Sequence, residues 1–212
     1  MRKISSTLFI FVLFFSPFTG IIYAEQENFH FRHTRWGMSQ EEVKKAENGE
    51  PDPKRSKGST LVWKAELLGE NVLVVYTFAF NKLVRAKYML LKYFSWSKTL
   101  YPSVPPPKPI VGECIVDFDK FEKALIEKYG KPEKQEARFS KEIGIVNDKR
   151  SDIEDLEVME NAIRNTKGFW ASTWKTKDTQ TVLILHGKSG EINFEIGYSS
   201  IKLMHLEKEA PL

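Results

Sequence analysis

Four groups of residues have types and spacings that could carry chemistry. The first, Gly187-Lys188-Ser189-Gly190, has the composition of a phosphate-binding loop. That motif also requires a glycine where Val182 stands and a helix after its last residue. Because the residues from Glu191 onward alternate between polar and apolar as a strand does, we expect a hairpin turn here instead.

Two histidines and a cysteine form the second and third groups. His30 and His33 are three residues apart and could ligate a metal ion from one helix, but no third ligand stands at a matching spacing. We expect a surface arm there. Cys114 is the chain's single cysteine, and its neighbours Ile115 and Val116 favour a small buried residue over a nucleophile paired with a histidine base. We therefore expect no metal, no cofactor and no catalytic residue.

The fourth group is the acidic stretch from Asp148 to Glu160, which lacks the ligand spacing and central glycine of a calcium loop. We expect the solvated face of a helix. The signatures of nucleophile elbows, zinc proteases and dinucleotide sites are also missing. The sequence favours a non-catalytic protein, and the alternative is an envelope hydrolase with an unfamiliar site around His186 or His33.

The first 24 residues have the three parts of a secretory signal peptide. Arg2 and Lys3 are positive, Leu8 to Phe15 is apolar without interruption, and small or turn-forming residues precede Ala24. The apolar run is shorter than the roughly 20 residues that span a bilayer. We expect residues 1–24 to be cleaved and the rest to be exported to the periplasm or the extracellular space, without stable membrane insertion. The alternative is a retained membrane anchor.

Composition excludes several classes of protein. The chain has 212 residues, of which 42% are hydrophobic and 28% charged, as in ordinary globular proteins. Lys and Arg number 32 against 28 Asp and Glu, and removal of Arg2 and Lys3 lowers the net charge from +4 to +2. Since the two signs are interleaved along the chain, we expect no nucleic-acid binding. A single cysteine allows no disulfide within the chain, so stability must come from an apolar core.

The elements that position these residues fall into two similar units. In the first unit, residues 25–94, Ser39 and Glu42 form a capping box that begins a short helix, and Asn48-Gly49 ends it. Apolar alternation then predicts three strands, with a hairpin turn at Asn81-Lys82. These strands are 61–67, 72–80 and 84–90.

The second unit, residues 117–212, follows a proline-rich connection over residues 95–116, which also has the composition of a ligand for proline-binding domains. A helix capped by Asp117 carries one apolar stripe as far as Tyr129. A weaker pattern over residues 153–163 indicates a further helix, and a short helix is expected at the C-terminus. The three strands of this unit are 169–176, 179–186 and 191–198.

We predict an α+β fold of two tandem units, each a helix followed by an antiparallel three-stranded meander, with the helices on one face. The pattern leaves open whether the meanders form one sheet or two abutting sheets. The spaced motifs of the chain resemble those of a group of uncharacterised secreted or envelope bacterial proteins. They are Phe31 to Lys44 with Trp36-Gly37-Met38-Ser39, Phe80-Asn81-Lys82-Leu83, Lys128 to Pro132, Trp174-Lys175-Thr176 and Tyr198-Ser199-Ser200.

The tandem pattern is also similar, more distantly, to beta-lactamase inhibitor protein and to small outer-membrane assembly lipoproteins. These resemblances imply a sheet surface that binds proteins. The sequence thus favours an exported, non-catalytic protein-binding or assembly module of the bacterial envelope, with another envelope protein as partner. A carrier of a small apolar ligand is a further alternative.

Four aromatic residues lie beyond the last clear alternation and beside the proline segment. They are candidates for partner contact, because large amphipathic rings dominate protein interfaces. The alternative is that the rings pack over the seam between the two units. The four residues are Tyr93, Phe94, Trp96 and Tyr101.

Overall fold

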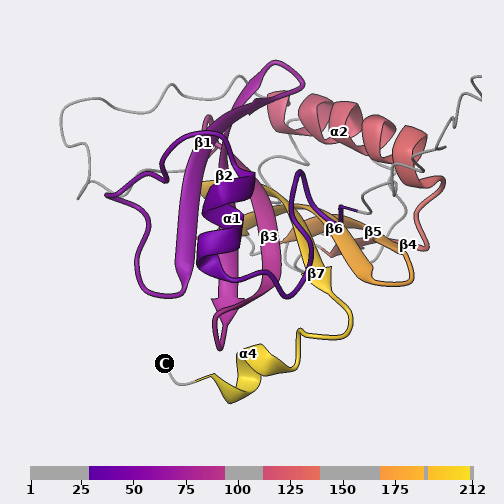
Figure 1. The fold of residues 1–212 in the computed structure, drawn as a ribbon. Helices are drawn as coiled ribbons and strands as arrows, with labels where there is room; N and C mark the ends of the chain where they lie inside the picture. Colours follow the sequence, from indigo (N-terminus) through magenta and orange to yellow (C-terminus); the bar gives the residue numbers. More distant parts are fainter. Residues whose placement is uncertain (1–28, 94–111, 139–167, 189–190, 211–212) are drawn as a thin grey trace, which may run out of the picture.

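The computed structural model describes residues 29–93, 112–138, 168–188 and 191–210 (Figure 1). Its strands are β1 (Thr60–Leu67), β2 (Glu70–Ala79), β3 (Lys82–Leu90), β4 (Lys134–Arg138), β5 (Phe169–Lys175), β6 (Thr179–Lys188) and β7 (Glu191–Ser200). Its helices are α1 (Gln40–Ala46), α2 (Glu113–Tyr129) and the short α4 (Leu206–Glu209).

All seven strands form one antiparallel sheet in the order β1-β2-β3-β7-β6-β5-β4. The prediction of two helix-plus-three-strand units is therefore wrong: the sheet is continuous through the pairing of β3 with β7, and β4 adds a strand at its edge. Apolar alternation could not reveal β4, because Ala137 is the single apolar residue of Lys134–Arg138. Charged side chains on an edge strand discourage pairing with other chains.

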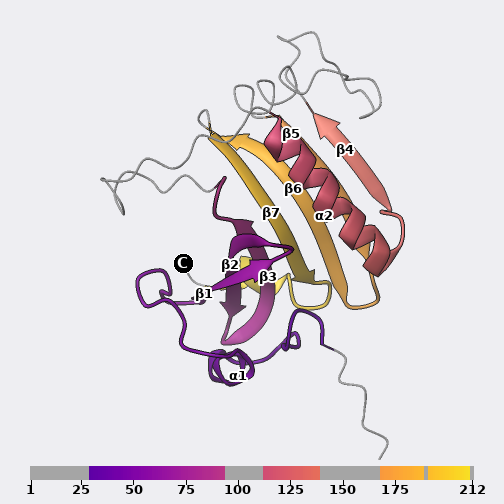
Figure 2. The same cartoon turned by 90° about the horizontal axis from the view of Figure 1, so that it is seen from above.

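Helices α1 and α2 lie over the same face of this sheet (Figures 1 and 2). Val43 of α1 is fully buried in the core beside the β1 and β2 side chains Trp63 and Tyr76. From α2, the Phe118 ring stacks on Trp170 of β5 at a centroid distance of 5.4 Å. The core is thus a single layer between one sheet face and two helices, and the covered positions of every strand alternate with positions on the opposite face.

The beginnings of the two helices differ from each other in how they are capped. At α1 the predicted capping box is present: the Ser39 hydroxyl accepts from the Glu42 N–H at 3.3 Å, and the Glu42 carboxylate accepts from the Ser39 N–H at 2.8 Å. Helix α2 begins at Glu113 after Gly112, one turn before the expected cap. Asp117 is therefore no cap but a buried residue within the helix.

The β2–β3 hairpin turns one residue earlier than predicted. Its two central residues are Phe80 and Asn81, with φ of 49° and 56°, which is the left-handed geometry of a type I′ turn. The Asn81 side-chain oxygen accepts from the Gln40 N–H at 3.1 Å and so holds the start of α1 against the turn. The β6–β7 hairpin was predicted correctly, because the strands pair as far as Lys188 and Glu191.

Matching hydrogen bonds occur on the two sides of the β3–β7 junction. Trp63 of β1 donates its indole N–H to the carbonyl of Gly49, just after α1, at 3.0 Å. Trp174 of β5 donates to the carbonyl of Gly130, at the end of α2, at 2.8 Å. Both strands are third from the junction, and both glycines have positive φ. Each half therefore fixes its helix end by the same bond.

The N-terminal arm lies across the junction between the halves. The buried ring of Phe31 contacts three tyrosine rings, with centroids 5.4, 4.9 and 4.8 Å away. These rings belong to Tyr76 of β2, Tyr88 of β3 and Tyr198 of β7. Trp36 donates its indole N–H to the Thr179 hydroxyl of β6 at 2.8 Å, so the arm is attached on both sides of the junction.

Replacing Ser39 with Ala should lower the free energy of unfolding by about 1 kcal/mol, because it removes the acceptor for one N–H of the first turn of α1. Chemical denaturation measures the change. Ser59→Ala, in the exposed segment before β1, is the control and should change it by less than about 0.5 kcal/mol. Equal stability of Ser39→Ala and the parent would contradict a role for the cap.

The contribution of the N-terminal arm to the stability of the fold should decrease below neutral pH. His30 stacks on Trp36 and accepts from its backbone N–H through Nδ1 at 3.1 Å, which requires a neutral ring. Burial lowers the pKa of His30, and Arg35 and Lys202 add to this although Asp178 opposes it. The stability from neutral His30 is therefore complete above about pH 6.5 and falls as pH drops through the lowered value.

His30→Phe keeps an aromatic ring but removes the titrating group. Between pH 7 and pH 5 the free energy of unfolding should fall more for the parent than for this variant. Parallel pH profiles for the two proteins would show that the protonation of His30 is not coupled to folding.

Candidate functional site

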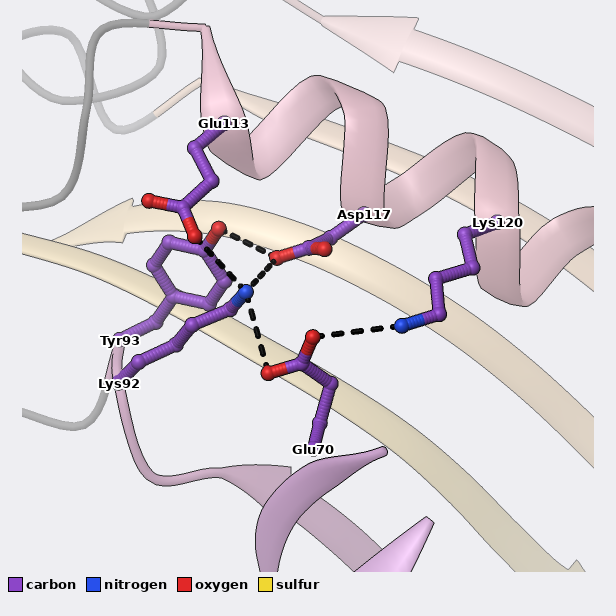
Figure 3. A network of polar contacts seen from close by, with 6 residues as sticks. All are labelled: Glu70, Lys92, Tyr93, Glu113, Asp117 and Lys120. Carbon is purple, nitrogen blue, oxygen red and sulfur yellow. Dashed lines mark hydrogen bonds and ion pairs between the residues drawn. The ribbon is translucent and has the colours of Figure 1, made fainter. Parts of the chain in front are cut away.

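A network of charged groups joins the ends of β2 and β3 to α2 (Figure 3). The Lys92 ammonium lies 2.6 Å from the Asp117 carboxylate, 2.9 Å from Glu113 and 3.1 Å from Glu70. Tyr93 donates its hydroxyl to Asp117 at 2.5 Å. Tyr93 is buried, so its expected exposure to a partner is wrong. Its ring lies against Phe194 of β7, which the sequence pattern could not indicate.

The electrostatics of this network favour structure over catalysis. Burial alone would lower the pKa of Lys92, but its hydrogen bonds to Asp117, Glu113 and Glu70 outweigh this and raise it. Burial and the hydrogen bond to Asp117 raise the pKa of Tyr93 well above its ordinary value. Both groups keep their protons at neutral pH, so neither is poised as a base or a nucleophile.

A second network holds the arm and α1 to the sheet. The buried Glu47 carboxylate accepts from the Arg32 guanidinium at 2.9 Å and from the Tyr76 hydroxyl. Burial, together with the bond to Glu47, raises the pKa of Tyr76 far above its usual range. A third carboxylate, Glu122 of α2, is also buried and accepts from Ser172 of β5 at 2.5 Å. Each of these carboxylates connects a helix to the sheet.

The cysteine and the histidines that the sequence marked as candidates for chemistry lie apart from one another. Cys114 is fully buried, as the sequence predicted. His33 is exposed and packs its ring edge-on to Phe29, whereas His186 is half-buried on the face of β6 opposite the helices. Among the described residues, no group of three or more His, Cys, Asp and Glu side chains could hold a metal ion.

Several predicted features fall outside the part of the chain that the structure describes. They are Phe94, Trp96 and Tyr101, the proline segment, the acidic stretch and the helix expected over residues 153–163. Partner contact through the three aromatic residues stays a prediction.

A further feature is the sheet face opposite α1 and α2, where Val62, Leu73 and Ala171 are buried and the central side chains are half-buried. We call its centre the open face. Val75, Lys87, Met89, Val182, Ile184 and Glu195 form it, and all six are half-buried. The strand register places Val75 beside Lys87 on β3, and Gly197 lies between Lys87 and Val182 on β6. Lys87 and Glu195 form an ion pair across the strands at 2.9 Å.

Helix α4 lies at one corner of this face, where Glu207 pairs with Arg85 at 2.6 Å. A small hollow also opens near the face, lined by Met89, Leu90, Asn193, Phe194 and Glu195. It has no enclosed space that a water molecule could occupy, whereas ligand pockets have about 300–1,000 Å³. This hollow does not support the carrier of a small apolar ligand.

Sequence reasoning identified the two faces of most strands but not which face the helices leave open. Val182 and Ile184 alternate with Leu183 and Leu185, so both faces of β6 are apolar. Only the register to β5 and β7 shows that Leu183 and Leu185 belong to the core. The apolar residues on both faces of β6 were the signal that could have indicated an apolar surface on the side of the sheet away from the helices.

The chain matches no family model, no curated protein and no solved structure. Among the described residues, no helix combines the length and apolar character that a bilayer crossing requires.

Asp117→Asn should lower the free energy of unfolding by about 2 kcal/mol, because it removes the buried charge that pairs with Lys92 and weakens the acceptor for Tyr93. Urea denaturation measures the loss. Glu127→Gln, on the exposed side of the same helix, is the control for loss of an acidic charge and should change stability by less than about 0.5 kcal/mol. Equal losses in the two variants would contradict a special role for Asp117.

Proposed function

We propose that the protein is an exported, non-catalytic module that binds another protein of the bacterial cell envelope through its open face. The carrying observation is the composition of that face: half-buried Val75, Met89, Val182 and Ile184 surround the Lys87–Glu195 pair. Such a mixture of apolar area and a few charges is typical of protein interfaces.

The shape of the open face also favours a protein partner. Gly197 contributes no side chain at its centre, so a partner's backbone or an aromatic ring can approach the sheet closely.

The buried polar groups support binding over catalysis. Asp117, Glu47 and Glu122 each accept hydrogen bonds that connect helices to the sheet. These are the groups whose burial would otherwise suit acid or base chemistry. Export rests on the sequence of residues 1–24, and the bacterial envelope on the family resemblance of the motifs around Trp36 and Tyr198.

Site-specific photo-crosslinking in producing cells tests the proposal. A benzoyl-phenylalanine at position 184, on the open face, should give a discrete adduct with an envelope protein. The same group at position 123, on the outer side of α2, should give none. Val182→Lys in the chain carrying the probe should reduce the adduct by about tenfold, since a long charged side chain obstructs the face.

Val182→Lys should leave the fold intact, because a half-buried lysine can extend its ammonium to solvent. Its melting temperature, compared with that of the parent, checks this point. Adducts from position 123 alone, or none from position 184, would contradict binding through the open face.

A further inference from the structure

One end of the sheet combines exposed apolar side chains with lysines. We call it the α4 end. It comprises the β2–β3 turn, the β5–β6 turn and the connection from β7 to α4 (Figure 1). The Ile201 N–H donates to the Asp178 carbonyl at 3.0 Å, and Glu207 pairs with Arg85 of β3 at 2.6 Å, so these segments contact one another. Phe80, Ile201 and Met204 are 55%, 38% and 39% exposed here.

The conformation of Phe80 makes its exposure unusual. Its φ of 49° is in the left-handed region, where asparagine or glycine fits and a bulky side chain is unfavourable. Because the ring is more than half exposed, packing does little to offset this unfavourable backbone conformation. Neither the turn nor the core accounts for a phenylalanine at this position, which suggests a contact outside the molecule.

Lysines surround these apolar side chains. Five exposed lysines lie on the same turns or next to them: Lys82, Lys175, Lys177, Lys202 and Lys208. Acidic groups nearby are paired, Asp178 with Lys202 and Glu207 with Arg85, whereas Glu209 is exposed. Lys82, Lys175 and Lys177 form no ion pair among the residues that the structure describes, although the charge of Lys177 contributes to the lowered pKa of Asp178. The α4 end is therefore positive with an apolar centre.

We propose that the α4 end binds the surface of an anionic phospholipid bilayer. Phe80, Ile201 and Met204 enter the headgroup region, and the lysines contact lipid phosphates, as in other proteins that lie on membranes. The apolar side chains project from separate turns and lysines surround them, which favours an anionic lipid surface over a protein. Contact at this end leaves the open face free, so the inference does not depend on the proposed function.

The opposite end of the sheet offers a matched comparison. Leu68 occupies the same position in the β1–β2 turn as Phe80 does in the β2–β3 turn, with φ of 53° and 46% exposure. Its chain neighbours Glu66 and Glu70 are acidic, and Glu70 pairs with Lys92 and Lys120, so these two lysines are already neutralised. An exposed apolar residue in a strained turn is thus present at both ends, but only one of the two has the charge that an anionic surface attracts.

Co-sedimentation with vesicles tests the proposal, using the chain from Glu25 onward so that the apolar residues 8–15 do not contribute. The chain should bind vesicles of phosphatidylglycerol and phosphatidylethanolamine but not of phosphatidylcholine, and added salt should weaken binding. Phe80→Asn should weaken it by about tenfold or more, while Leu68→Asn should leave it unchanged. Because asparagine suits the turn, Phe80→Asn should melt no earlier than the parent.

The lysines are tested by a pair of double variants of equal charge. Lys175→Gln with Lys177→Gln should weaken vesicle binding severalfold, whereas Lys64→Gln with Lys123→Gln should not. Equal effects of the two pairs, equal effects of Phe80→Asn and Leu68→Asn, or no binding to phosphatidylglycerol vesicles would each overturn the proposal. Binding of an acidic protein through Phe80 without any vesicle binding would also overturn it.

Discussion

The pairing of β3 with β7 is the constraint on which the rest of the molecule depends. Arg85 to Met89 hydrogen-bond with Ser199 to Glu195 and so join two meanders that are far apart in the chain. A one-residue slip in this register would place Tyr88 and Tyr198 on opposite faces of the sheet. Phe31 then could not contact Tyr88 and Tyr198 together, and the arm would lose its place across the junction. One register thus sets both the core and the open face.

Buried carboxylates hold the helices to this sheet, and they lie on one of its two faces. Glu47, Asp117 and Glu122 lie on the helix side, where the low-polarity surroundings strengthen their hydrogen bonds and make a missing partner costly. The polar groups of the opposite face are half-buried, so the loss of a hydrogen-bond partner there costs less free energy. Changes there alter the surface with little effect on folding. Half-buried residues on the face opposite the two helices can therefore change while the core stays constant.

Local sequence patterns were enough to predict the start of α1 and the positions of most strands. Ser39 and Glu42 predicted the start of α1, and alternation placed the six longer strands within a few residues. It missed β4, whose polar residues carry no alternation, and shifted the β2–β3 turn, because Phe80 is unexpected in a left-handed conformation. Asp117 was expected as a cap and Tyr93 as exposed, since nothing local shows that Lys92 and Phe194 meet them in the fold. The open face depends on register, which is a property of the whole sheet.

The matching tryptophan bonds of the two halves have a consequence for assembly. Trp63 with Gly49 and Trp174 with Gly130 lie symmetrically about the β3–β7 junction, as equivalent groups do in a two-fold dimer. A dimer of separate halves would exist only above a certain concentration. Here the two halves share one chain, so each meets its counterpart at an effective concentration that dilution does not change. The junction persists at any expression level, and the two sides are free to differ: among the described strands, β4 has no counterpart on the other side.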